Sequence, residues 1–238
     1  MELNGARTLV AGATGVLGGG IARALHKEGA RLVLAGRDGD RLAGLAHELG
    51  GAPTAGFEAL DLERCAAVVD EAAEHLGGLD VLVVAFGVAA FGPGEAPGQG
   101  HGDDVITEHL LTVNTMAPMA MGRRAVHRMD GSGTLAVISA ILADVPTPGM
   151  AVYSASKAGL SAWLTALRGE QRRKGVTVFD VRPPHIETGL AGRALAGEAP
   201  AMAAGATVDE LVGLVVDGIR DGRRELRYDL QKREFTGR

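Results

Sequence analysis

The chain has 238 residues, of which 46% are hydrophobic and 22% charged, and it carries a formal net charge of −5. This length fits one α/β domain and no linker-like stretch divides it, so we predict a single domain over residues 1–238. The acidic balance, with no basic cluster, excludes the usual surface for nucleic acids or anionic membranes. The one cysteine, Cys65, cannot form an intramolecular disulfide, which favours a reducing, cytoplasmic location. No apolar run is long enough to span a membrane, and no metal site is expected.

Short apolar runs alternate with longer stretches of helical spacing along the whole first part of the chain. Buried strands are predicted at 8–11, 31–35, 57–60, 81–85, 135–138 and 176–181. Helices are predicted at 21–28, 40–49, 62–76, 104–129 and 151–174. Right-handed crossovers return each helix over the sheet, so this alternation favours parallel strands with helices on both faces. The sequence therefore predicts a doubly wound α/β fold.

Ligands of such sheets bind beyond the carboxyl ends of the strands, so the loops that follow the strands are where a site is expected. Two of these loops, 86–102 and 183–206, are rich in glycine or proline. The second is small and apolar, a composition typical of a mobile lid over a hydrophobic ligand. We therefore expect a substrate lid at 184–206, although the same composition fits a disordered segment.

A glycine-rich turn follows the first predicted strand and opens the first helix. Gly12, Gly15 and Gly18 recur at three-residue spacing, with Thr14 and Leu17 between them. Glycines let the backbone approach a pyrophosphate, whose charge is met by free amides and by the positive end of the helix dipole. The alternative is an ordinary tight turn between strand and helix.

The residues after the second and third predicted strands bear on which dinucleotide would bind. Arg37 follows Gly36 where a carboxylate would bind an unphosphorylated ribose. A guanidinium pairs with a 2′-phosphate through two hydrogen bonds, which favours NADP(H) over NAD(H), unless Arg37 lies free in solvent. Asp61, with Leu62 beside it, is predicted to contact the adenine; Asp61 could equally cap the following helix, and both can hold.

One of only two tyrosines, Tyr153, lies four residues before Lys157, and this pair gives the strongest chemical signal in the chain. At this spacing on a helix the two side chains share a face, so the ammonium can favour the ionised phenol. A free tyrosine has a pKa of about 10, and a neighbouring cation brings it toward the working range. The alternative is an amphipathic helix with a packed Tyr153 and a solvated Lys157.

With these motifs the chain resembles the short-chain dehydrogenase/reductase family over nearly its whole length, which implies a Rossmann-like fold. The resemblance implies that Tyr153 is the general acid for carbonyl reduction, and the base for alcohol oxidation, while Lys157 holds the nicotinamide ribose. It also implies that Asn114 supports a water-linked proton path. Near the nicotinamide, the contacts implied are those of Pro183, Ile186 and Thr188.

The chain departs from the family pattern at several site positions. The residues Val84, Ala85, Phe86 and Gly87 stand where the family has Asn-Asn-Ala-Gly, with Ala85 and Gly87 still expected at the cofactor. Pro184 replaces a glycine. The family's Ser-Ser pair is Ser139-Ala140 here, and the spacing to Tyr153 places Ala140 at the substrate carbonyl. Either the loop 141–150 is rearranged so that Ser139 contacts the substrate, or this donor is missing, at a cost of about a hundredfold to a thousandfold in rate.

The resemblance therefore implies an NADP-preferring oxidoreductase that interconverts a ketone and a secondary alcohol, and the lid composition favours a lipophilic small molecule. The altered stretch at 84–87, together with Ala140, leaves open a cofactor-binding or redox-sensing protein without turnover. The spacing of the three glycines, typical of the family's extended branch, leaves open an epimerase or isomerase that uses bound cofactor transiently. The helices at 104–129 and 151–174 resemble the family's dimerisation pair, so a homodimer is expected, with a homotetramer as the alternative.

Overall fold

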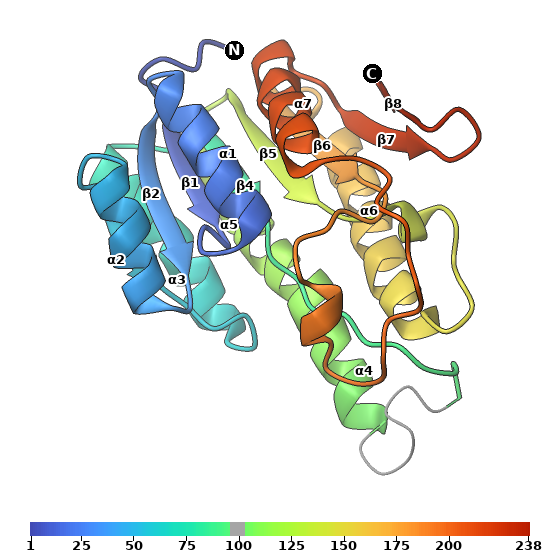
Figure 1. Cartoon of the computed structure of the whole chain (residues 1–238). Helices are drawn as coiled ribbons and strands as arrows, with labels where there is room; N and C mark the ends of the chain where they lie inside the picture. Colours follow the sequence, from blue (N-terminus) through green and yellow to red (C-terminus); the bar gives the residue numbers. More distant parts are fainter. Residues whose placement is uncertain (96–102) are drawn as a thin grey trace.

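The computed structural model describes residues 1–95 and 103–238, so residues 96–102 of the glycine-rich loop at 86–102 lie outside the description. Within the described ranges, eight strands form one sheet in the order β3-β2-β1-β4-β5-β6-β7-β8 (Figure 1). The strands are β1 (Arg7–Ala11), β2 (Arg31–Gly36), β3 (Thr54–Gly56), β4 (Val81–Val84), β5 (Gly133–Ile138), β6 (Val176–Arg182), β7 (Glu225–Asp229) and β8 (Glu234–Gly237). Neighbouring strands are parallel except that β8 runs antiparallel to β7. The predicted doubly wound, Rossmann-like α/β fold is confirmed.

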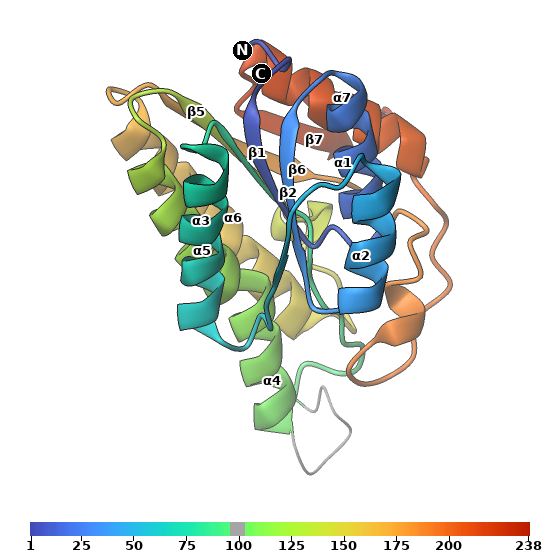
Figure 2. The same ribbon diagram turned by 90° about the vertical axis from the view of Figure 1, so that its left-hand side faces the viewer.

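Helices cover both faces of the sheet. They are α1 (Val16–Lys27), α2 (Gly39–Glu48), α3 (Leu62–Leu76), α4 (Asp103–Leu111), α5 (Ala117–Arg128), α6 (Ala151–Gln171) and α7 (Val208–Asp221). Figure 2 shows α3, α5 and α6 on one face and α1, α2 and α7 on the other. None of the helices in the described ranges is long and apolar enough to cross a membrane.

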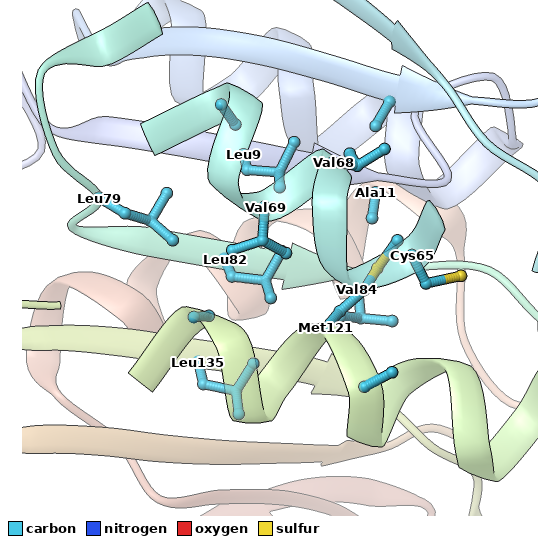
Figure 3. Close-up of a cluster of buried hydrophobic side chains, with 14 of the residues drawn as sticks. Leu9, Ala11, Cys65, Val68, Val69, Leu79, Leu82, Val84, Met121 and Leu135 are labelled. Carbon is cyan, nitrogen blue, oxygen red and sulfur yellow. The ribbon is translucent and has the colours of Figure 1, made fainter. Parts of the chain in front are cut away.

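The two faces of the sheet are packed by alternate residues of each strand. Leu9 of β1 faces α3 and α5, where it packs with Val68, Leu82 and Met121 (Figure 3). Its neighbour Val10 packs into the other layer, against α1 and α7. The central strands are covered by helices on both faces, so neither face is exposed to solvent. This explains why the sequence of these strands is continuously apolar. The site-bearing loops are left at the carboxyl ends of the strands.

Three features of the fold differ from the sequence predictions. The predicted strand at 57–60 is wrong: β3 lies earlier, at Thr54–Gly56, because these residues pair with the end of β2, and Phe57 packs into the core from the loop. The predicted helix at 104–129 is broken by a π-helix, Thr112–Met116. The elements α7, β7 and β8 were not predicted. A signal for α7 was available, because Thr207 caps the helix by accepting a hydrogen bond from the Glu210 amide, with the spacing of a capping box.

Candidate active site

A cleft of about 450 Å³ opens beyond the carboxyl ends of the central strands. Of the residues predicted from the sequence, those lining it are Gly12, Thr14, Gly15, Leu17, Arg37, Ala85, Gly87, Ser139, Tyr153, Lys157, Pro183, Ile186 and Thr188. The structure therefore brings together residues from six separate segments of the chain. Gly18, Asp61, Leu62 and Asn114 do not line the cleft and are described below.

The glycine turn is packed so closely that side chains are excluded from it. Gly12 has φ +87°, and a Cβ there would lie 2.8 Å from the carbonyl carbon and oxygen of Ala85. Gly18 lies in the first turn of α1 against the carbonyl of Gly12, so its place is in the packing of the turn. Gly15 precedes α1 with no side-chain cap, which leaves the amides at the start of this helix available to an anion. This arrangement fits a pyrophosphate.

Two arginines lie at the end of the cleft formed by β2 and α2. Arg37, Asp38 and Arg41 all line it, and the Asp38 side chain accepts a hydrogen bond of 3.0 Å from the Arg41 amide and caps α2. The carboxylate nearest in sequence is thus engaged by the helix start. Arg41 was missed by the sequence analysis. The available signal was a second arginine in the first turn of the helix that follows Arg37.

Asp61 is the N-cap of α3, and its carboxylate accepts a hydrogen bond of 2.8 Å from the Arg64 amide. Neither Asp61 nor Leu62 is among the residues that line the cleft. The corresponding part of the wall comes from 57–60 instead and includes the carboxylate of Glu58, which the sequence analysis did not single out. Two functions were considered for Asp61, contact with the adenine and capping of the following helix. The geometry of Asp61 supports the capping function.

We expect Asp61→Ala to lower the free energy of unfolding by about 1 kcal/mol, the usual cost of losing an N-cap, while the affinity for the predicted dinucleotide stays unchanged. Chemical denaturation and a binding titration measure the two quantities. Weaker dinucleotide binding at unchanged stability would contradict the capping interpretation.

Tyr153 and Lys157 lie at the start of α6, and both are almost completely buried, with 8% and 4% of their surface exposed. The Lys157 Nζ lies 6.0 Å from the centroid of the Tyr153 ring and donates a hydrogen bond of 3.3 Å to the carbonyl of Ile138. Burial raises the pKa of Tyr153 to about 12. Burial also lowers the pKa of Lys157 to about 8, against the opposing charge of Asp180.

These pKa directions differ from the sequence prediction, in which the lysine brings the tyrosine toward neutrality. Desolvation outweighs the cation, because the Tyr153 hydroxyl is buried while the Lys157 ammonium is directed to the Ile138 carbonyl. At neutral pH the phenol of the protein alone is therefore protonated. This is the state that can donate a proton.

Asn114 lies in the π-helix and is completely buried. Its amide oxygen accepts from the Val88 N–H at 2.9 Å, and its amide nitrogen donates to the Val88 carbonyl at 2.9 Å and to Ser156 Oγ at 3.1 Å. The side chain thus ties the loop after β4 to α6. A Cβ on Gly87 would lie 3.0 Å from Asn114 Oδ1 and 3.4 Å from Lys157 Nζ. The absence of a side chain at Gly87 therefore lets this loop reach both residues.

The π-helix also affects the Asn114 main chain. Pro118 follows four residues later and has no N–H, so it cannot form the α-helical hydrogen bond to the Asn114 carbonyl. Single π turns of this kind are frequent at functional sites. The predicted support of a water-linked proton path by Asn114 would use this carbonyl, because the side-chain amide is already bonded within the protein.

Ser139 and Ala140 follow β5 at the floor of the cleft. The Ser139 hydroxyl donates a hydrogen bond of 2.5 Å to Asp180 and lies 3.1 Å from the carbonyl of Val181, both on β6. Ala140 packs with Met150 and Tyr153 in a separate apolar cluster. The methyl group of Ala140 is thus part of the apolar wall beside Tyr153, and the Ser139 hydroxyl is engaged with β6. A contact between Ser139 and a substrate stays a prediction.

The segment 184–206 crosses the end of the sheet to which the strand arrows point (Figure 1). Backbone hydrogen bonds join it to the loop after β4, from Leu195 N to the Ala89 carbonyl at 2.7 Å and from Phe91 N to the Ala196 carbonyl at 2.9 Å. Its own ends are joined by a bond of 2.9 Å from Gly205 N to the His185 carbonyl. The segment thus forms a closed loop that supplies one wall of the cleft.

No group of three or more His, Cys, Asp or Glu residues within 1–95 and 103–238 could hold a metal ion.

Comparison with known proteins identifies the family. The family model described as short chain dehydrogenase matches residues 6–199. The chain is 30% identical over 195 residues to the 3-oxoacyl-[acyl-carrier-protein] reductase FabG of Rickettsia felis, covering 80% of this chain and 76% of that protein. It is 32% identical over 193 residues to nodulation protein G of Rhizobium meliloti, covering 79% and 76%.

Among solved structures, a short chain dehydrogenase from Burkholderia cenocepacia J2315 in complex with NADP is similar, with a TM-score of 0.79 and 26% identity over 92% of both chains. The match of the family model extends from β1 to the segment after β6 and so includes nearly every residue of the cleft. The chain therefore belongs to the short-chain dehydrogenase/reductase family of NAD(P)-dependent oxidoreductases.

Proposed function

We propose that this protein reduces a ketone on an apolar small molecule to a secondary alcohol, with NADPH as cofactor and Tyr153 as the proton donor. The observation that carries the proposal is the placement of Tyr153 and Lys157 in the same cleft as the glycine turn and Arg37. One end of this cleft suits a phosphorylated dinucleotide, and the other has a buried acid beside an apolar wall.

The cleft residues fit NADP(H). The turn of Gly12, Gly15 and Gly18, with the uncapped start of α1, suits the pyrophosphate, and Arg37 and Arg41 suit the 2′-phosphate. At the other end, the cofactor contacts are assigned to Ala85, Gly87, Pro183, Ile186 and Thr188. When bound, NADPH supplies the hydride.

Proton donation falls to Tyr153. Its phenol is protonated at neutral pH and can donate to the carbonyl oxygen of a substrate as negative charge develops there. Lys157, whose ammonium lies 6.0 Å from the phenol ring, stabilises that charge and binds the nicotinamide ribose. Carbonyl reduction uses the phenol in this protonated state, and reduction is the direction that we propose.

The proposed substrate is lipophilic because the wall beside Tyr153 is apolar. Residues that line the cleft and pack in one apolar cluster with Tyr153 are Val88, Ala89, Phe91, Ala140, Leu142, Met150, Leu190, Ala191 and Met202. Several of them belong to 184–206, the segment proposed as a substrate lid. Closing it would bury an apolar ligand and exclude water from the reacting carbonyl.

The experiment that tests this function follows NADPH absorbance and alcohol product for a panel of apolar ketones, with a polar ketose as the comparison. The panel includes a 3-oxoacyl thioester, since the Rickettsia felis relative is named as a reductase of that class. Alcohol formed in step with NADPH loss, and faster for apolar ketones, supports the proposal. Product without net change in absorbance indicates an epimerase or isomerase. NADPH binding without consumption by any ketone indicates a binding or redox-sensing protein.

Cofactor preference depends on Arg37. We expect Arg37→Ala to weaken NADPH binding by about tenfold to a hundredfold, since a charged hydrogen bond contributes about 1.5–3 kcal/mol, and to leave NADH binding unchanged. Fluorescence titration of both cofactors measures this. The matched control is Arg31→Ala, because Arg31 is an exposed arginine at the opposite end of the same strand. Equal weakening of NADPH and NADH in Arg37→Ala would contradict the assignment.

A homodimer is part of the proposal, since the exposed residues of α6 include the small residues Ala155, Gly159, Ala162 and Ala166, which would let a second helix approach closely. A cytoplasmic location likewise stays a prediction from the single buried thiol, Cys65.

A further inference from the structure

Asp180 is a completely buried carboxylate in the middle of the sheet, on β6. One of its oxygens accepts the Ser139 hydroxyl at 2.5 Å, and the other accepts the Nε of Arg182 at 2.7 Å. Removing a carboxylate from water is costly unless it is paired and fully hydrogen-bonded. Both oxygens of Asp180 meet this condition. The function proposed above assigns this carboxylate no role.

Arg182 connects Asp180 to the turn that follows β5. Its Nη1 donates to Asp144 at 2.8 Å, in the turn that follows β5, and Asp144 also binds Arg227 of β7. Arg182 itself is buried, and Glu225 lies 3.8 Å from its Nη2. Burial would lower the pKa of Arg182, but Asp180 and Asp144 raise it above its ordinary value, so the guanidinium stays charged. A buried ionic network therefore fixes the floor of the cleft.

The same network reaches Lys157 through the end of β5. The Lys157 ammonium donates to the Ile138 carbonyl at 3.3 Å, and the next residue, Ser139, donates its hydroxyl to Asp180. The register of the sheet pairs Ile138 with Val181, the residue after Asp180. The ammonium is thus bonded to the last residue of β5, and the carboxylate to the residue that follows it. The charge of Asp180 raises the pKa of Lys157 against the burial that lowers it.

The described charged and titratable groups on the elements around Lys157 are few. Its own helix contributes Tyr153, and β6 contributes Asp180 with Arg182 on the far side of the carboxylate. The loop after β4 contributes Gly87, and the π-helix contributes Asn114, neither of which titrates. The turn after β5 contributes Asp144, which is engaged by Arg182 and Arg227, and α4 contributes His109 to the cleft. Asp180 is the only one of these that acts on Lys157 with an opposite charge.

We propose that Asp180 is a positioning residue of the active site, which holds the Ser139 hydroxyl at the end of β5 and stabilises the buried Lys157 ammonium. This inference rests on the proposed function, because Lys157 must stay protonated to bind the cofactor ribose and to stabilise charge at Tyr153. It assigns Ser139 to this network. The hydrogen bond that orients Lys157, from its ammonium to the Ile138 carbonyl, is then formed within the protein and does not depend on bound substrate.

The test measures the titration of Lys157 in the cofactor-free protein, by trace acetylation at a series of pH values and mass spectrometry of the peptide. In Asp180→Asn the negative charge is removed, and we expect the pKa of Lys157 to fall by about one unit or more. In Arg182→Gln the charge of Asp180 is no longer neutralised, and we expect the pKa of Lys157 to rise. Shifts in opposite directions cannot come from a general loss of stability.

The matched control is Glu225→Gln, which removes another buried carboxylate of the same network, one bound mainly to Arg168 and Arg238. We expect Lys157 to titrate there as in the unaltered protein. If Asp180→Asn is too unstable to titrate, the rise in Arg182→Gln decides the question alone. An unchanged Lys157 titration in both Asp180→Asn and Arg182→Gln would overturn the proposal.

A second measurement separates this inference from the proposed function. The pH above which NADPH affinity weakens would move down in Asp180→Asn together with the titration of Lys157. If the Lys157 titration shifts but neither the unaltered protein nor any variant binds NADPH at any pH, the positioning role stands and the proposed function fails.

Discussion

Replacing Tyr153 with phenylalanine is expected to lower the turnover of ketone reduction by about a hundredfold to ten-thousandfold, the usual contribution of a positioned acid. The change removes one hydroxyl and keeps the ring, which packs with Ala140 and Met150. Fold and NADPH affinity should therefore be preserved, so that the loss falls on kcat. Steady-state kinetics and an NADPH titration of the same preparation separate the two quantities.

The chain supplies a matched control in its other tyrosine. The Tyr228 hydroxyl donates a hydrogen bond of 2.9 Å to the Gly205 carbonyl, so Tyr228→Phe also deletes one bonded hydroxyl, but on β7. We expect it to lose far less turnover than Tyr153→Phe. Equal effects of the two substitutions, or full activity in Tyr153→Phe, would remove Tyr153 from the proposed chemistry.

Gly12→Ala is expected to damage both the fold and the cofactor site. The new Cβ would lie 2.8 Å from the Ala85 carbonyl carbon and oxygen and 3.0 Å from Phe86 Cβ, on a backbone with φ +87°. Left-handed backbone costs about 1–2 kcal/mol for a residue with a side chain, and overpacking about 1–3 kcal/mol more. We expect the free energy of unfolding to fall by about 2–5 kcal/mol and NADPH binding to be lost, as measured by denaturation and titration.

Gly44→Ala is the control for this substitution. Gly44 lies in the middle of α2, is exposed, and has nothing within 4 Å of its added Cβ. Here alanine should raise stability by about 0.5–1 kcal/mol, because it favours the helix. A stable Gly12→Ala protein that binds NADPH normally would contradict the assignment of the turn to the pyrophosphate.

The parts of the site that the sequence predicts are those formed by neighbours in the chain. The glycine turn and the pair Tyr153 and Lys157 follow from local spacing, since a turn and a helix determine their geometry within a few residues. Arg37 is similarly placed by the end of a strand. These residues lie in one cleft because parallel strands end at one edge, which the alternation of strands and helices already implies.

Other features depend on contacts between distant segments and could not be read from local spacing. Ser139 and Asp180 are 41 residues apart in sequence, and only the pairing of β5 with β6 brings them together. The pKa of Tyr153 depends on its burial by several loops, and a helical pattern carries no information on that depth. β3 was misplaced because Phe57, apolar and β-prone, is buried from a loop rather than from a strand.

The measurement that tests the central claim most directly is the transfer of deuterium from labelled NADPH to a product alcohol. NADPH carrying deuterium on one face of the nicotinamide ring, at the position of the transferred hydride, is incubated with the protein and a ketone that the protein reduces. A parallel experiment uses NADPH labelled on the other face. The account predicts deuterium on the carbinol carbon from one of the two labels only. It also predicts that the rate of deuterium transfer falls in Tyr153→Phe by the same factor as the turnover. Alcohol without deuterium from either label, or bound NADPH that gives no alcohol with any ketone, would contradict it.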